Sequence, residues 1–139
     1  HLLQATVNAA LGRVPPLAGM WQVTERLLDH IRDSFKPDTG DVGYDQTMAA
    51  LRAASVLCLD EFGAENPTPW AASRLQELVD YRYRAYTERM HQGGCLTVLA
   101  SNKPLDQWPA YLRSRAEDIR CQVFELWNAP NMRRVTKTG

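Results

Sequence analysis

Long hydrophobic runs are absent from this sequence of 139 residues. No apolar stretch approaches the roughly 18 residues that a membrane-spanning helix needs, so the sequence indicates no membrane partner. An excess of either charge is also lacking, because 16 Lys and Arg side chains balance 16 Asp and Glu side chains. The molecule as a whole therefore lacks the strongly basic character that is typical of nucleic-acid-binding domains. From residue 109 onward, basic residues exceed acidic ones by six to three, which indicates either an anionic partner or a solvated basic tail.

Cysteine is scarce, with three residues and no pair at the CxxC spacing. An odd number without that spacing argues against a disulfide framework and against a structural zinc site. Cys58, Cys95 and Cys121 each lie in or beside an apolar segment, so they are predicted to pack as small hydrophobic side chains. The three histidines lie far apart in the chain, which argues against a histidine metal site. Free thiols of this kind favour a reducing, cytoplasmic location.

Short apolar segments alternate with amphipathic segments along the chain. The apolar segments are predicted to be strands, and the segments between them have helical periodicity. Strands that alternate with helices form a mostly parallel sheet with helices on both faces, which is a three-layer α/β fold. The length suits a single domain. The predicted strands are residues 17–21, "SVLCLD" at 55–60, "CLTVLASN" at 95–102 and "CQVFEL" at 121–126.

Local signals predict where several helices begin. Thr24 is predicted to cap a helix with its hydroxyl group. Thr68 has the same role, and Pro69 follows it at the first helical position, where proline is favoured. The turn-rich stretch "KPDTGDVG", residues 36–43, is predicted to be a mobile loop.

Polar side chains follow two of the predicted strands. Asp60 and Glu61 come directly after four apolar residues, and Ser101 and Asn102 follow the next strand. Ligands of parallel α/β sheets bind outside the carboxyl ends of the strands. There, one carboxylate can bind Mg²⁺ together with nucleotide phosphates, and a second can orient a water molecule. A strand that simply stops where solvent begins would show the same residues, so the pair alone is weak evidence.

The order of the motifs along the chain is more specific. "VLCLDEFGAE", "TPWAASRLQELVDYRYRAY", "LTVLASNKPLDQW" and "LRSRAED" follow one another between residues 56 and 118. This series resembles the DnaC-like helicase-loader branch of the AAA+ ATPases, and the related IstB-type transposition ATPases share it. The resemblance covers nearly the whole chain. It implies a P-loop NTPase fold of the AAA+ type, with ATP and Mg²⁺ as cofactors.

The resemblance also implies roles for individual residues. Asp60 matches the carboxylate that serves Mg²⁺, Glu61 the base that orients water, and Asn102 the sensor of the terminal phosphate. Arg115 matches the arginine finger that completes the site of a neighbouring subunit in a homo-oligomer, and Arg113 competes for that role. Nucleotide-sensing arginines near the C-terminus have two further matches, Arg133 and Arg134.

Two segments are candidates for contact with single-stranded DNA. "YRYRAYTER" places Arg82 and Arg84 among tyrosines, a mixture that can stack on bases, but packing or a subunit contact is the favoured interpretation. The segment with Arg26, Arg32 and Lys36 is the second candidate, because related initiators bind DNA there. Its alternative is an ordinary amphipathic helix.

The phosphate-binding loop of the family, G-x-x-x-x-G-K-[ST], is absent from the sequence. Such a loop supplies backbone N–H groups and a lysine to the phosphates. In the family a His-Leu helix follows this loop, and the chain begins "HLLQA", so we expect residues 1–139 to be an ATPase core that starts just after it. The implied function is ATP-dependent loading of a replicative helicase. The alternatives are an IstB-like regulator of a transposase and a binding module that uses no nucleotide.

Overall fold

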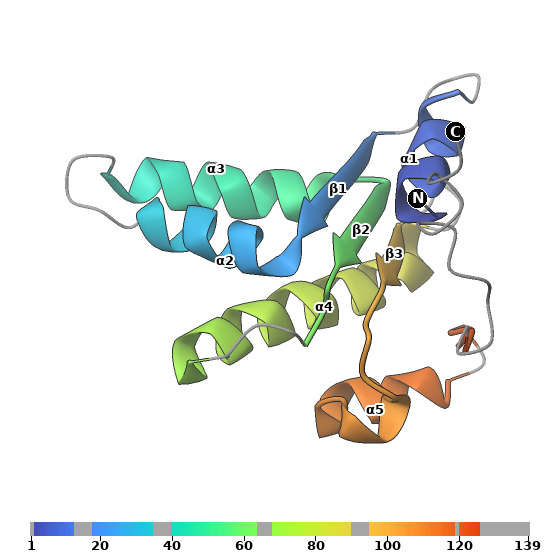
Figure 1. The fold of residues 1–139 in the computed structure, drawn as a ribbon. Coiled ribbons are helices and arrows are strands. Elements are labelled where there is room, and N and C mark those ends of the chain that lie inside the picture. Colours follow the sequence, from blue (N-terminus) through green and yellow to red (C-terminus); the bar gives the residue numbers. More distant parts are fainter. Residues whose placement is uncertain are drawn as a thin grey trace, which may run out of the picture. The chain divides into compact units, whose positions relative to one another are not determined.

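Figure 1 shows the chain in a computed structural model, which describes residues 2–12, 18–34, 40–63, 68–89, 95–118 and 120–125. The chain divides into two compact units, His1–Trp108 and Pro109–Gly139. The first unit contains a sheet and the helices that pack on it, and the described part of the second contains the helix α5 (Ala110–Ala116). That residues 1–139 form one ATPase core stays a prediction.

Three parallel strands form the described sheet of the first unit: β1 (Gly19–Val23), β2 (Val56–Asp60) and β3 (Leu96–Leu99). β2 lies between the other two strands. The register places the first residues of all three strands side by side. The carboxyl ends of the strands therefore lie at one edge of the sheet, as expected for parallel strands joined by helices.

Helices cover both faces of this sheet (Figure 1). α1 packs against β1 and β2, whereas α4 packs against β3 and α3. Among the described residues, no helix is both long and apolar enough to cross a lipid bilayer. The sequence prediction of an α/β fold with a parallel sheet is thus confirmed. The helices of the first unit are α1 (Leu2–Leu11), α2 (Thr24–Asp33), α3 (Gly40–Ala53), α4 (Pro69–Arg89) and the 3-10 helix η2 (Leu105–Gln107).

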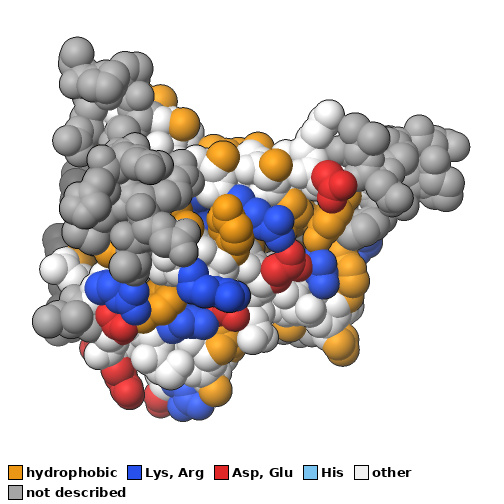
Figure 2. Space-filling model, turned by 180° about the vertical axis from the view of Figure 1, so that it is seen from behind, with side chains coloured by type: hydrophobic (Ala, Val, Ile, Leu, Met, Phe, Trp, Pro, Cys, Tyr) orange, Lys and Arg blue, Asp and Glu red, His pale blue; other side chains and the backbone are white. Residues whose placement is uncertain are grey.

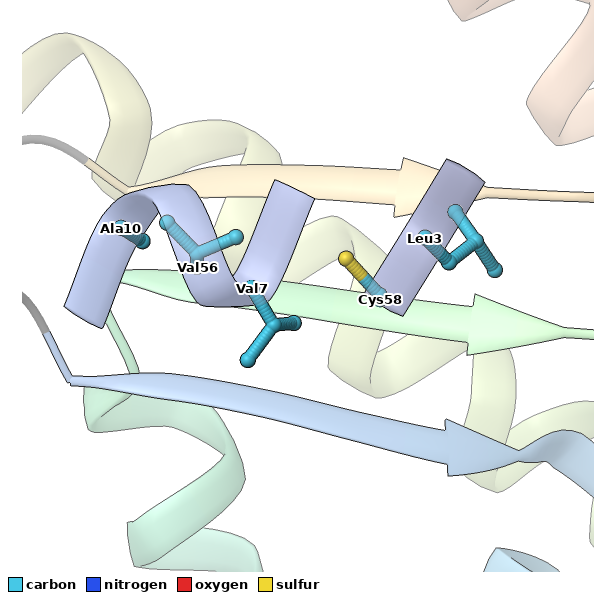
Figure 3. Packing of buried hydrophobic residues seen from close by; sticks show 5 residues of the cluster. All are labelled: Leu3, Val7, Ala10, Val56 and Cys58. Carbon is cyan, nitrogen blue, oxygen red and sulfur yellow. The ribbon is translucent and has the colours of Figure 1, made fainter. Parts of the chain in front are cut away.

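The core on the α1 face is a small apolar cluster (Figure 3). Three helix residues at spacings of four and three point onto the sheet, where they meet Val56 and Cys58 of β2. α1 approaches β1 closely, because a Cβ atom at Gly19 would lie only 3.1 Å from a methyl carbon of Val7. The helix residues of the cluster are Leu3, Val7 and Ala10.

The central strand β2 is buried on both of its faces. Cys58 faces the α1 cluster, and the alternate residues Leu57 and Leu59 are fully buried on the opposite side. Burial also raises the pKa of the Cys58 thiol, so this sulfur remains protonated and unreactive. Cys95 is buried as well, which confirms that these two cysteines pack as apolar side chains.

A buried arginine joins α4 to α3 and β3. Arg82 is 1% exposed, and its Nη1 donates hydrogen bonds to the backbone carbonyls of Leu51 and Ala54, both at 2.8 Å. Its Nε and Nη2 donate to Thr97 Oγ1 and to the carbonyl of Leu96, also at 2.8 Å. The last carbonyls of a helix lack partners within the helix and form its negative end, so a cation is favoured there. The prediction that Arg82 contacts DNA is wrong, because these bonds hold its side chain in the interior.

The beginning of α4 agrees with the sequence prediction. The Ala71 N–H donates to Thr68 Oγ1 at 3.2 Å, so Thr68 caps the helix and Pro69 occupies its first position. Leu75 and Leu78 of this helix are buried, as the helical periodicity of the segment requires. Capping and periodicity were therefore sufficient to place this helix.

Two predicted boundaries differ from the structure. The strand predicted over residues 17–21 runs over Gly19–Val23. α3 begins at Gly40, so residues 40–43 of the predicted loop are helical, whereas residues 36–39 lie outside the described part. α3 packs against α2 and α4, and such packing outweighs the weak helix propensity of glycine and aspartate.

The strand predicted over residues 121–126 is also not found where the structure describes the segment. Residues 121–125 form no strand, and residue 126 lies outside the described part. Val123 and Phe124 are 49% and 76% exposed. A strand needs a neighbour for its backbone hydrogen bonds, and apolar composition alone does not supply one.

Candidate functional site

The carboxyl ends of β2 and β3 bring the predicted site residues together. The register places Leu59 opposite Leu99, and the ladder continues beyond it, because Ala100 N–H donates to the Leu59 carbonyl at 2.9 Å. Phe62 N–H then donates to the Ala100 carbonyl at 2.8 Å. The loop that contains Asp60 and Glu61 is thus hydrogen-bonded to the segment that leads into Ser101 and Asn102.

The acidic pair has an unusual backbone conformation. The Glu61 N–H donates to Asp60 Oδ1 at 3.0 Å, and Glu61 has a φ angle of 54°. This left-handed region is uncommon for residues other than glycine, and residues held there cluster at functional sites. Asp60 is half-buried at the end of the strand, whereas Glu61 is exposed. The turn therefore separates one anchored carboxylate from one that faces solvent.

Thr24, the first residue of α2, supports this turn. Its Oγ1 donates to the backbone carbonyl of Asp60 at 2.8 Å, and the residue is fully buried. The predicted capping role of Thr24 is wrong, since α2 has Val23 at its N-cap position and no side-chain cap. The hydroxyl instead joins the start of α2 to the end of β2, a contact that spacing along the chain did not indicate.

We expect Thr24→Val to lower the free energy of unfolding by about 1–2 kcal/mol, because it leaves the part-buried Asp60 carbonyl without this donor while keeping the side-chain shape. Urea unfolding measures the change. The matched control is Thr6→Val in α1, where the hydroxyl only supplements a helical carbonyl, that of Leu2. Equal unfolding free energies for the two variants would contradict a stabilising role for the Thr24 hydroxyl.

The loop after β3 lies directly against the loop after β2. Ser101 Oγ accepts a hydrogen bond from the Lys103 N–H at 3.0 Å. A Cβ atom at Gly63, whose φ angle is 81°, would lie 3.5 Å from Lys103 Cδ and 3.8 Å from Ser101 Oγ. Asn102 is exposed between these two residues. Sequence reasoning did not single out Lys103, although it directly follows the predicted sensor asparagine.

Two of the predicted arginines belong to the second unit. Arg113 and Arg115 both lie on α5 of the second unit. Arg113 is exposed, and Arg115 is half-buried. The two nucleotide-sensing candidates, Arg133 and Arg134, lie outside the described residues. Their predicted roles are therefore untested.

The remaining DNA-binding candidates lie on exposed helix surfaces. Arg26 is exposed on α2, and Arg84 is exposed on α4. Arg32 pairs with Asp29 at 3.1 Å, and its guanidinium carbon lies 5.9 Å from the centre of the Trp70 ring. Figure 2 shows Lys and Arg side chains intermixed with Asp and Glu on the face that it displays, so this face favours no single charge. Lys36 lies outside the described residues.

The chemistry at Asp60 suits the Mg²⁺ that the resemblance implies. Among the residues that the structure describes, no group of three or more His, Cys, Asp or Glu side chains forms a metal cage. Mg²⁺ that binds together with a nucleotide needs only one or two carboxylates, because phosphates and water supply the other ligands. The half-buried Asp60 and the adjacent exposed Glu61 match this small donor set.

An open surface pocket lies on α3 and α4, away from the acidic pair. Arg52 at the end of α3 pairs with Glu77, which also contacts Arg74 at 2.7 Å. The end of α3 leads into the beginning of β2, so this pocket lies near the amino end of the sheet. Ligands of parallel sheets bind at the other end, and the paired charges here favour no particular ligand. The lining residues are Arg52, Ser73, Gln76, Glu77, Asp80, Tyr81 and Arg84.

No protein-family model and no curated protein matches the sequence. Among solved structures, AMPPCP-bound DnaA from Aquifex aeolicus matches with a TM-score of 0.65 and 16% sequence identity. The match covers 83% of this chain and 33% of the DnaA chain, so this chain spans about a third of that structure's length. At this identity the likeness shows the fold alone, and the chain shares the α/β fold of the matched part of that DnaA structure.

Proposed function

We propose that this protein is an ATP-hydrolysing AAA+ factor of DNA replication that loads a replicative helicase onto single-stranded DNA. The observation that carries the proposal is the meeting of Asp60, Glu61 and Asn102 at the carboxyl ends of two neighbouring strands. This is the edge at which open α/β sheets bind their ligands. The DnaA structure with the same fold holds AMPPCP, an ATP analogue, which supports a nucleotide as the ligand.

Each of the three residues has a role that suits its chemistry. The carboxylate of Asp60 would hold Mg²⁺, which neutralises charge on the phosphates when it is bound. Glu61 extends into solvent next to it and orients the attacking water. Asn102 has an amide that can donate to the terminal phosphate or hold the same water. Phosphate binding also requires a Gly-Lys-Ser/Thr loop, and we propose that the full-length protein supplies it before residue 1.

The direct test is ATP hydrolysis by the full-length protein. We expect hydrolysis that needs Mg²⁺ and that is lost when Asp60 is changed to Ala, because the metal then loses its protein carboxylate. Phosphate release with and without Mg²⁺ measures both effects. If the full-length protein neither binds nor hydrolyses ATP in the presence of DNA, the proposal is wrong and the nucleotide-independent binding module takes its place.

The arginine finger is tested by mixing two inactive variants. We expect Arg115→Ala to reduce turnover by about 10³-fold, and mixing it with Glu61→Gln to restore part of the activity, because each variant supplies what the other's site lacks. The Arg113→Ala variant is the matched control on the same helix. If no mixing ratio of Arg115→Ala with Glu61→Gln restores turnover, a finger that acts between subunits is contradicted. If Arg113→Ala is the inactive variant, and only its mixture with Glu61→Gln restores turnover, the finger is Arg113.

The partner distinguishes helicase loading from transposition. A loader is expected to bind a hexameric replicative helicase and to increase the amount of helicase on single-stranded DNA. An IstB-like regulator would instead bind a transposase and prefer target DNA. Copurification of the full-length protein with each candidate partner in the presence of ATP separates the two functions.

A further inference from the structure

Trp108 touches both loops of the candidate site. Its indole Nε1–H donates a hydrogen bond to the backbone carbonyl of Lys103 at 2.9 Å. Its ring lies against Phe62, with 5.5 Å between the ring centres and 31° between the planes. Phe62 is 2% exposed, so the aromatic contact is anchored in the interior. All three residues belong to the first unit.

These contacts lie next to the residues proposed to act on ATP. Phe62 directly follows Glu61 in the chain, and Lys103 directly follows Asn102. One side chain is thus joined to the loop after β2 through a ring contact and to the loop after β3 through a hydrogen bond. The bond from Phe62 N–H to the Ala100 carbonyl joins the same two loops through the backbone.

The two loops need such support for physical reasons. Glu61 and Asn102 are both exposed, so their own side chains are not fixed by packing. Glu61 also has a left-handed backbone, a conformation that persists only where the surroundings stabilise it. The Phe62 ring and the Lys103 carbonyl belong to the residues that directly follow Glu61 and Asn102 in the chain. Trp108 contacts both the Phe62 ring and the Lys103 carbonyl.

We propose that Trp108 is a positioning residue that holds Glu61 and Asn102 in register with each other for phosphate chemistry. Trp108 itself is not expected to touch the nucleotide. This inference rests on the proposed ATPase function, because the register of these two residues matters only if they act on the same phosphate. A small displacement of a catalytic group can reduce turnover strongly. Trp108 can therefore affect turnover although it does not contact the nucleotide.

Two substitutions separate the ring contact from the hydrogen bond. In the full-length protein, Trp108→Leu removes both, and Trp108→Phe keeps an aromatic ring near Phe62 while it removes the indole N–H. We expect kcat to fall by about tenfold or more in Trp108→Leu and by less in Trp108→Phe, with KM for ATP within about twofold of the wild type. Rates are expressed per nucleotide-binding site, so that a loss of folded protein does not count as a loss of turnover.

Trp21→Leu is the matched control, because Trp21 lies on β1 and is 39% exposed. It is expected to leave kcat unchanged. An equal decrease of kcat in both variants, or an unchanged kcat per site in Trp108→Leu, would overturn the positioning role.

Hydrogen exchange tests the same inference independently of turnover. In Trp108→Leu we expect faster exchange of the amides of Phe62 and Lys103, with the amides of β2 unchanged. Unchanged protection at these two amides would show that Trp108 does not hold the loops, even if the wild type hydrolyses ATP. Absence of hydrolysis in the wild type would instead refute the proposed function, and this inference with it.

Discussion

Glu61→Gln in the full-length protein is expected to leave ATP binding intact and to reduce turnover by at least about 100-fold. The amide keeps the size of the side chain and its place in the loop, but it cannot accept a proton or orient water as a carboxylate does. The left-handed backbone of Glu61 is unaffected by this change, because glutamine has the same main-chain restrictions. Nucleotide titration and phosphate release measure binding and turnover separately.

The control for this variant is Glu25→Gln, which removes an exposed carboxylate from the first turn of α2. That change is expected to leave turnover unaltered and to alter stability only slightly, through the helix dipole. Undiminished hydrolysis by Glu61→Gln would remove Glu61 from the mechanism. Loss of ATP binding together with turnover would show that Glu61 acts in binding and not as the base.

Arg82→Met is expected to lower the free energy of unfolding by about 3–5 kcal/mol, which is a large part of the stability of a typical domain. Methionine fits the space of the aliphatic stem but offers no hydrogen bonds. The carbonyls of Leu51, Ala54 and Leu96 then lose their donors in a buried environment. Chemical unfolding followed by circular dichroism measures the loss, and a lower yield of folded protein is expected as well.

Arg84→Met is the matched control, because Arg84 is exposed on the same helix, where its Nε donates to the Asp80 carbonyl at 3.3 Å. Its effect is expected to stay within about 0.5 kcal/mol. Arg82→Lys adds a third point, since lysine keeps the charge but cannot reproduce the planar set of donors, so an intermediate loss is expected. If Arg82→Met is as stable as Arg84→Met, the buried bonds do not stabilise the fold.

Because Arg82 is buried, fewer residues remain as candidates for contact with DNA. Arg26 and Arg84 are exposed, and Arg32 is exposed although it pairs with Asp29. Contact with DNA by these three residues and by Lys36 stays a prediction. Because acidic residues lie among them, any affinity for DNA must come from local geometry more than from a continuous basic field.

Much of the architecture was predictable because its signals are local. The four apolar residues before Asp60 indicated a buried strand, and Thr68 with Pro69 indicated the beginning of α4. Strands that alternate with helices predicted the parallel sheet, since each crossover requires a helix of sufficient length. A parallel sheet in turn places Asp60 and Asn102 at the same edge. These conclusions depend on periodicity and chain order, which the sequence contains in full.

Contacts between residues distant in the chain could not be predicted in this way. Thr24 looked like a helix cap, yet its hydroxyl reaches the carbonyl of Asp60, 36 residues away. For the segment with Arg82 the sequence favoured packing or a subunit contact but indicated no partner, and the side chain bonds to carbonyls of α3 and β3. No sequence signal indicated a role for Trp108, although it joins the two loops of the site.

The sequence by itself determined the fold class and the burial of the strand before Asp60, and it indicated the three residues proposed to act on ATP, whereas the central position of that strand came from the structure. Only the tertiary structure decided that Thr24 supports the acidic turn, that Arg82 is internal and that Trp108 contacts both loops. The physical reason is the range of the interactions. Helix and strand propensities depend on neighbours within a few residues, whereas a buried donor bonds to whichever acceptor the packed elements bring within about 3 Å.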